Sequence, residues 1–183
     1  MKGIVFTEFL DMTEARFSAD IADRMITEAA LPSGGAYTSV GTYDIKEMVA
    51  LLSALSSLTG TPVSQLLEEF GRHLFPRFVA TFPDFFIGVT SSFQFLASVD
   101  SVVHLEVRKL YPDAELPTFK CREVSGGRML MEYRSDRNLP DLAEGLIRGC
   151  AQHFGEDLSI ARSVSPDDPG AIVFEIRRSG QPL

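Results

Sequence analysis

The chain has 183 residues, of which 45% are hydrophobic and 23% are charged. This length and balance are typical of one globular domain with a sizeable core, and they exclude a disordered or collagen-like chain. The formal net charge of −8 argues against a nucleic-acid partner, because binding to a phosphate backbone needs a positively charged surface.

Composition also limits membrane and metal sites. No segment approaches the roughly 18 unbroken apolar residues that a transmembrane helix needs, and the N-terminus lacks a signal-peptide pattern, so we expect a cytoplasmic protein with no membrane partner. Cys121 and Cys150 are too few for a disulfide scaffold or a cysteine-rich zinc site, and we expect them to be reduced. The histidines His73, His104 and His153 leave room for a site with one histidine ligand.

Residues 1–110 are predicted to be helical, because their apolar positions recur at spacings of three and four. Residues typical of helix boundaries support this prediction, namely Ser18, Asp44, Gly60 and Pro62. A helix that starts after Pro62 should break or kink at Pro76. The many phenylalanines at 70–86 fit either a simple core or the wall of a pocket for a flat apolar ligand.

After Pro117 the pattern changes from helices to strands. Two hairpins joined by a helix are predicted, with strands at 118–124, 128–135, 157–165 and 171–178, a tight turn at 125–127, a helix at 139–154 and a frayed end at 179–183. The predicted fold class is therefore α+β, in which a helical N-terminal half packs on a C-terminal half with a four-stranded antiparallel sheet.

One histidine and one short motif are candidates for binding chemistry. His104 lies beside the apolar stripe of the helix predicted for 93–110, where it is either a boundary residue or an axial ligand of haem. Tyr133, Ser135 and Arg137 alternate along a predicted strand and would share one face. Taken alone, they are explained more simply by a solvated strand face. Together with His104, their hydroxyls and guanidinium supply what haem capture requires, an axial nitrogen and an anchor for two propionates.

Several segments resemble the H-NOX family of haem-nitric oxide/oxygen binding domains. They are MKGIVFTEFL at the start, SGGAYTSVGTYD at 33–44, VHLEVRKLYPDAELP at 103–117 and YRSDR at 133–137. The resemblance covers nearly the whole chain. It implies one H-NOX domain over 1–183, with a helical distal subdomain to about residue 60, proximal helices and the sheet from about 61, and haem between them.

The resemblance also implies roles for individual residues around a b-type haem. His104 is the expected proximal ligand of the iron, Tyr133, Ser135 and Arg137 are expected to hold the propionates, and Pro117 is expected to press on the haem and distort it. The expected residues of the distal pocket, where a gas would bind, are all apolar: Val5, Phe9, Leu74, Phe78, Leu142 and Leu146.

Gas selectivity follows from the distal residues. Oxygen-binding relatives carry a distal tyrosine at the position of Leu142, and such a donor stabilises bound oxygen by about 1.5–3 kcal/mol. An apolar wall therefore favours nitric oxide, and also carbon monoxide, over oxygen. His73 is expected outside the pocket, because it neighbours Leu74 and successive helical residues point about 100° apart.

The function implied is a nitric oxide sensor, not an enzyme. Nitric oxide is expected to bind ferrous haem, break the bond between iron and His104, and signal to a separate histidine kinase or cyclic-di-GMP enzyme, such as a diguanylate cyclase or phosphodiesterase. The alternatives are an oxygen or redox-state sensor, a small haem enzyme that uses His73, and a carrier of apolar ligands without haem. Peroxidase or oxygenase chemistry would need a distal acid/base pair or an axial thiolate, and neither cysteine lies at the proximal position.

Overall fold

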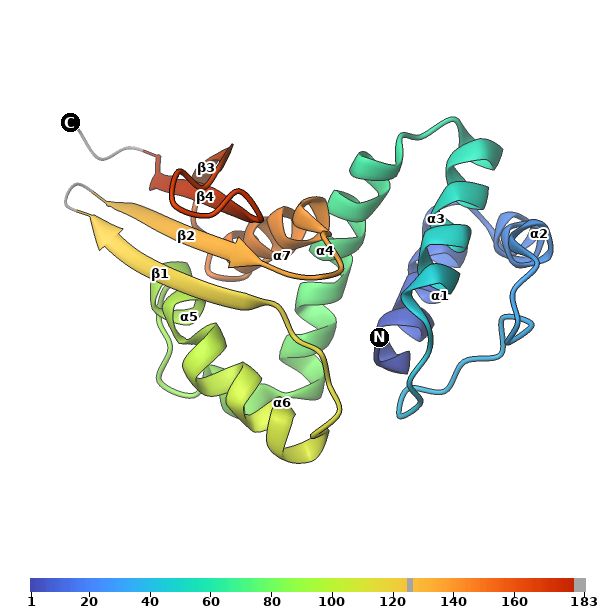
Figure 1. Cartoon of the computed structure of the whole chain (residues 1–183), viewed down its shortest axis with the longest axis horizontal. Coiled ribbons are helices and arrows are strands. Elements are labelled where there is room, and N and C mark those ends of the chain that lie inside the picture. The colour runs from blue at the N-terminus through green and yellow to red at the C-terminus, as the bar shows by residue number, and fades with distance from the viewer. Residues whose placement is uncertain (125–126, 180–183) are drawn as a thin grey trace.

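The computed structural model describes residues 1–124 and 127–179, and its helices and strands confirm the predicted α+β class (Figure 1). The helices are α1 (Gly3–Arg16), α2 (Ala19–Ala29), α3 (Ile45–Thr59), α4 (Val63–Thr81), the 3₁₀-helix η1 (Pro83–Phe86), α5 (Ser92–Ser98), the π-helix η2 (Val99–Val103), α6 (His104–Leu110) and α7 (Pro140–His153). The strands are β1 (Thr118–Val124), β2 (Arg128–Arg134), β3 (Leu158–Val164) and β4 (Ala171–Arg178). Within the described part of the chain, no helix is long and apolar enough to span a membrane.

The predicted helix boundaries are confirmed by their hydrogen bonds. The side chain of Ser18 accepts a bond from Ile21 N–H at 3.2 Å, and Asp44 accepts one from Lys46 N–H at 2.9 Å. These side chains satisfy backbone donors that the first turn of a helix leaves unpaired. Gly60 ends α3 with a φ of 71°, a left-handed conformation that glycine adopts without a steric cost.

Of the two outcomes predicted at Pro76, a break or a kink, the break is wrong, because α4 continues to Thr81 with Pro76 inside it. Proline removes the backbone bond to the carbonyl of Arg72 and costs about 3 kcal/mol inside a helix. The side chains of Pro76 and Arg72 are both exposed, whereas the carbonyl of Arg72 lies on the side of α4 that faces α7, 3.4 Å from where a Cβ atom on Gly149 would be. The neighbouring Leu74 and Phe75 are buried, and their packing holds this part of α4 in place.

Two hydrophobic clusters lie on either side of α4 and α7. The first cluster joins the helical lobe, which we define as residues 1–60, to α4 through side chains such as Phe9, Leu55 and Phe70. The second cluster joins α5, α7 and the sheet, and Phe174 lies at its centre with no exposed surface. Figure 1 shows the helical lobe and the sheet on opposite sides of α4.

The sheet has strand order β1-β2-β4-β3, and all of its neighbours are antiparallel. On β2, Met129, Met131 and Tyr133 are buried and alternate with more exposed residues, so one face of the sheet packs on α5 and α7 and the other faces solvent. Of the tight turn predicted at 125–127, residues 125–126 lie outside the described part of the chain, as do residues 180–183 of the predicted frayed end.

The backbones of α4 and α7 touch where they cross. A Cβ atom on Gly145 of α7 would lie 2.1 Å from the carbonyl oxygen of Glu68 and 2.9 Å from Cα of Gly71, both on α4. Only glycine fits such a contact. The crossing therefore fixes Leu142 and Leu146, which flank Gly145 on α7, relative to α4.

Candidate functional site

His104 is the first residue of α6 and follows directly after a wide turn of the helix. The backbone N–H of His104 donates a hydrogen bond to the carbonyl of Val99, five residues earlier, as in a π-helix. Such turns occur frequently at functional sites. The side chain of His104 is 12% exposed, and its ring centroid lies 5.7 Å from that of Phe119 on β1. His104 therefore faces the second cluster, to which Phe119 and Val103 belong.

The imidazole of His104 has a carboxylate partner that sequence reasoning missed. Its Nδ1 atom lies 3.2 Å from Oδ1 of Asp100, one helical turn earlier. Burial lowers the pKa of His104 below its usual value, and it outweighs the raising effects of Asp100 and of the Pro117 carbonyl. The imidazole is therefore neutral at pH 7, which is the form that binds metals. The spacing of four residues between Asp100 and His104 was the signal that could have found this pair.

The motif residue Tyr133 lies near the end of β2, and Ser135 and Arg137 lie in the turn that follows this strand. Their predicted placement along one strand face is wrong, because β2 ends at Arg134. Backbone groups inside the turn hold it together: Leu139 N–H donates to Tyr133 Oη at 3.1 Å, and Arg137 N–H donates to Ser135 Oγ at 3.2 Å. A strand period could not predict this turn, because its geometry depends on bonds to side chains.

This turn leaves its donors available for an anion. The hydroxyls of Tyr133 and Ser135 already accept backbone bonds, so each keeps a proton to donate. The guanidinium of Arg137 is 18% exposed, and its ion pair with Glu115 spans 3.2 Å to a carboxylate that is 85% exposed. An exposed glutamate loses little by leaving such a pair. The turn can therefore bind one or two carboxylates of a ligand.

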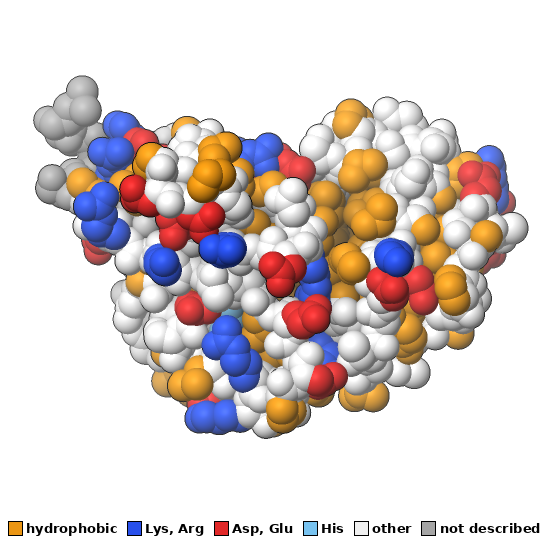
Figure 2. Space-filling view, in the orientation of Figure 1, with side chains coloured by type: hydrophobic (Ala, Val, Ile, Leu, Met, Phe, Trp, Pro, Cys, Tyr) orange, Lys and Arg blue, Asp and Glu red, His pale blue; other side chains and the backbone are white. Residues whose placement is uncertain are grey.

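The predicted distal residues come from three helices and belong to one hydrophobic cluster. Phe9 and Leu74 are buried within the first cluster. The remaining four are half-buried and pack against it: Val5, Phe78, Leu142 and Leu146. Leu146 also contacts the second cluster, so this apolar wall reaches the part of the molecule that carries His104. Figure 2 shows hydrophobic side chains along a hollow between the helical lobe and the sheet.

Two tyrosines also pack against the first cluster, and their hydroxyls are occupied elsewhere. Tyr37 donates to the carboxylate of Glu47 at 2.8 Å. The hydroxyl of Tyr43 accepts a bond from Thr38 N–H at 2.9 Å. Burial and the bond to Glu47 contribute to raising the pKa of Tyr37 to about 12, so its hydroxyl stays protonated and bound to Glu47. Tyr37 is therefore not a free donor toward the apolar wall, and the hydroxyl of Tyr43 is directed at Thr38, whose Oγ1 also lies 3.4 Å from it.

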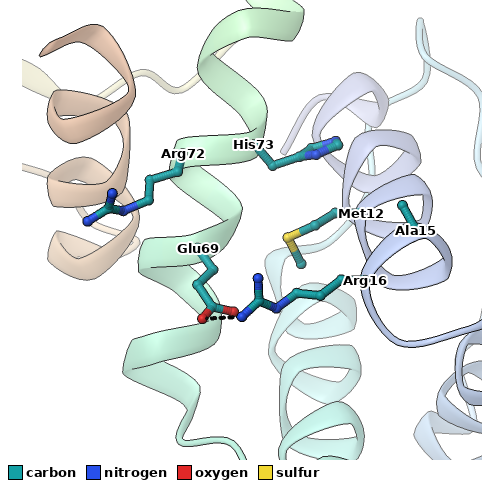
Figure 3. Close-up of a pocket in the computed structure, with 6 residues that line it drawn as sticks. All are labelled: Met12, Ala15, Arg16, Glu69, Arg72 and His73. Carbon is teal, nitrogen blue, oxygen red and sulfur yellow. Dashed lines mark hydrogen bonds and ion pairs between the residues drawn. The ribbon is translucent and has the colours of Figure 1, made fainter. Parts of the chain in front are cut away.

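His73 lies at the surface between α1 and α4, whereas the adjacent Leu74 is buried. Figure 3 shows its ring extending from α4 toward α1. Its Nε2 atom lies 3.4 Å from a carboxylate oxygen of Glu8, which also accepts bonds from Arg77 Nε at 2.8 and 3.0 Å. His73 lines a surface pocket of about 410 Å³, together with Met12, Ala15, Arg16, Glu69 and Arg72.

In the described part of the chain, the cysteines and the remaining carboxylates are not arranged as a metal site. Within residues 1–124 and 127–179, no group of three or more His, Cys, Asp or Glu side chains is placed to hold a metal ion. Cys121 and Cys150 are both free thiols. Burial raises the pKa of Cys121 to about 11 and that of Cys150 further, so neither is a thiolate at neutral pH.

Solved structures of similar proteins match this chain over its full length. The crystal structure of the Fe(II) unliganded H-NOX protein from K. algicida is 36% identical, with a TM-score of 0.90, and the match covers 100% of this chain and 99% of that one. The solution structure of the IWP-051-bound H-NOX from Shewanella woodyi in the Fe(II)CO ligation state is also 36% identical, with a TM-score of 0.85, covering 100% and 97% of the two chains.

A more distant relative and a family model agree with these structures. The soluble guanylate cyclase gcy-35 of Caenorhabditis elegans is 22% identical over 159 residues, which are 84% of this chain, and the match spans only 23% of that longer protein. The model of the haem-NO-binding family (HNOB) matches residues 2–162. The chain therefore belongs to the HNOB, or H-NOX, family of haem-binding gas sensors.

Proposed function

We propose that this chain senses nitric oxide through a b-type haem and catalyses no reaction itself. In this proposal residues 1–183 form one haem domain, with a distal subdomain that ends near residue 60. The haem lies between the apolar wall and α6. The observation that carries the proposal is that all six expected distal residues belong to or pack against one hydrophobic cluster and offer no side-chain donor: Val5, Phe9, Leu74, Phe78, Leu142 and Leu146.

The side chains present fit a haem. The neutral imidazole of His104 has its Nδ1 beside Asp100, which leaves Nε2 as the atom for an axial bond to iron. Tyr133, Ser135 and Arg137 keep the donors that two propionates require. Pro117 precedes β1, and its carbonyl is close enough to His104 to raise the pKa of the imidazole. We infer, from the family resemblance, that Pro117 would press on the bound haem and distort it.

The apolar wall determines which gas is held. A ferrous haem held by His104 would supply the iron that binds nitric oxide, and binding of the gas would weaken the hold of His104 on that iron. Bound oxygen would need a hydrogen-bond donor worth about 1.5–3 kcal/mol, and the wall supplies none from its six side chains. Nitric oxide depends little on such a donor, so the wall selects it over oxygen.

Movement of α6 can reach the helical lobe through the segment that follows this helix. Lys2 Nζ bonds to Thr42 Oγ1 at 2.9 Å, lies 3.4 Å from a carboxylate oxygen of Asp113, and lies 4.5 Å from the ring centroid of Tyr111. If His104 were released from the iron, α6 would be free to shift, and the Lys2 contacts would transmit that shift to the N-terminus of the chain. A partner that binds the two arrangements with different affinity converts this shift into a signal.

We infer that the partner is a histidine kinase or a cyclic-di-GMP enzyme, such as a diguanylate cyclase or phosphodiesterase, in the cytoplasm. Family resemblance supports this inference, and the free thiols of Cys121 and Cys150 fit a reducing compartment. Binding of purified kinase or cyclase to the haem-loaded protein, with and without nitric oxide, tests it. Equal affinity in both states would contradict a signalling role.

The absorption spectrum of the anaerobically reduced protein tests the central proposal. We expect a high-spin, five-coordinate ferrous haem, little change on brief exposure to air, and a five-coordinate product after nitric oxide is added. A stable oxygen complex would instead indicate an oxygen sensor, and turnover with peroxide would indicate a haem enzyme. Protein that stays colourless when haem is abundant would contradict all three functions and leave the apolar-ligand carrier.

A further inference from the structure

Asp100, His104 and Arg108 lie on one side of the helix formed by η2 and α6, each four residues after the previous one. Both later residues approach the same oxygen of Asp100: His104 Nδ1 lies 3.2 Å from Oδ1, and Arg108 Nη2 lies 3.8 Å from it. The hydrogen bond to His104 is partly buried, whereas the contact with Arg108 is 0.6 Å longer and more exposed. The carboxylate of Asp100 therefore interacts with both side chains, and its interaction with His104 is the closer one.

We propose that Asp100 is a positioning residue that sets the strength of the bond between His104 and the haem iron, and that Arg108 opposes it. This inference rests on the proposed function. A carboxylate that accepts the Nδ1–H proton fixes the imidazole tautomer and ring orientation, and it makes Nε2 a stronger ligand. Arg108 draws negative charge away from that carboxylate, so it weakens the effect.

The wide turn before His104 makes the role of Asp100 mechanical as well as electronic. Asp100 lies inside η2, and its bond to His104 spans the turn that the His104 N–H closes on Val99. The same hydrogen bond therefore orients the ligand and braces the backbone behind it. Besides the charged Asp100 and Arg108, the uncharged ring of Phe119 and carbonyl of Pro117 also lie near the imidazole.

The bond between Asp100 and His104 affects how readily nitric oxide can start a signal. Nitric oxide must break the bond between iron and His104, and Asp100 makes that bond harder to break. Loss of a hydrogen-bond partner of a metal ligand typically changes metal affinity or activity by about 10- to 100-fold. We therefore expect Asp100→Ala to speed loss of the iron–imidazole bond under nitric oxide by about tenfold, and Arg108→Gln to slow it.

Resonance Raman spectra of the haem-loaded ferrous protein test this directly, because the iron–histidine stretching frequency follows the strength of that bond. We expect a lower frequency in Asp100→Ala and a higher one in Arg108→Gln. Glu106→Gln and Lys109→Gln are matched controls. They remove one negative and one positive charge, as Asp100→Ala and Arg108→Gln do, but from an ion pair on α6 that does not touch His104. Their frequencies should equal that of the unaltered protein.

Proton NMR of the diamagnetic carbon monoxide complex gives a second measurement on the same protein. The His104 Nδ1–H signal should show a strong hydrogen bond in the unaltered protein and a weaker one in Asp100→Ala. An iron–histidine frequency that is the same in all variants would overturn the role of Asp100 and leave the sensor proposal intact. An iron–histidine band that persists in His104→Ala would overturn both.

Discussion

The two sides of the candidate haem site are built from opposite kinds of side chain. On the α6 side, His104 contacts the carboxylate of Asp100, and Arg108 lies beside that carboxylate. On the distal side, the six expected residues contribute only hydrocarbon and aromatic surface to the first cluster. The distal side can therefore choose among gases by withholding a hydrogen bond, while the proximal side can tune the bond that carries the signal.

The difference also shows where polar groups are tolerated. Tyr37 and Tyr43 lie at the border of the first cluster with their hydroxyls bound to Glu47 and Thr38, because an unpaired hydroxyl within the cluster costs about 1–3 kcal/mol. The proximal side pairs its charges near the surface, where solvent lowers that cost. Four substitutions break or sharpen this comparison, and the first has the largest expected effect.

Removing the proximal ligand should abolish haem binding. We expect His104→Ala to purify without haem, because the axial bond to iron is lost while the propionate donors alone hold the group weakly. Added imidazole should restore binding by occupying the space of the side chain. His153→Ala is the control and should keep its haem. Full haem content in His104→Ala without imidazole would contradict the assignment of the ligand.

Placing a hydrogen-bond donor in the apolar wall should make the distal side polar, as the proximal side already is. Leu142→Tyr puts a hydroxyl on α7 at the position where oxygen-binding relatives carry one, and we expect oxygen affinity to rise by about 10- to 100-fold. Leu142→Phe adds the same ring without the hydroxyl and should not bind oxygen more tightly. Oxygen equilibrium measured by absorption separates the two, and equal affinities would contradict the role of the hydrogen bond.

Weakening the propionate anchor should affect haem retention but not gas selectivity. Arg137→Ala removes charged hydrogen bonds, and we expect haem to transfer to an acceptor protein about tenfold faster. Arg134→Ala is the control, because Arg134 is exposed and pairs with Asp168 instead. Equal transfer rates in the two variants would show that the turn does not hold the haem.

Replacing the surface histidine should change gas binding least. His73 contacts Glu8 on the outer side of the contact between α1 and α4, so His73→Gln should leave the oxygen and nitric oxide spectra unchanged. A small loss of thermal stability is expected, because one contact of Glu8 is weakened. A change in oxygen affinity would place His73 in the distal pocket and support the haem-enzyme alternative.

Much of the local structure could be predicted from the sequence. Ser18, Asp44 and Gly60 mark helix ends because each satisfies or relaxes backbone groups within a few residues of itself. The strands follow from alternation of apolar residues, as at Met129 and Met131. The position of His104 beside an apolar helical stripe, together with the family resemblance, predicts it as the ligand of the haem iron. These features depend on neighbours along the chain.

Other features depended on contacts between distant segments. Helix α4 continues past Pro76 because Leu74 is buried in the first cluster and Phe75 is buried in the second. Ser135 and Arg137 meet in a turn, because Tyr133 holds the N–H of Leu139.

The sequence by itself determined most helices and strands, the candidate axial histidine and the apolar character of the expected distal residues, since these follow from residue type and local spacing. Only the tertiary structure decided that Val5 from α1, Phe78 from α4 and Leu142 from α7 form one wall, and that two nearby tyrosine hydroxyls are occupied. The physical reason is that hydrogen bonds and packing between helices depend on how the helices cross, and the close contact at Gly145 fixes that crossing.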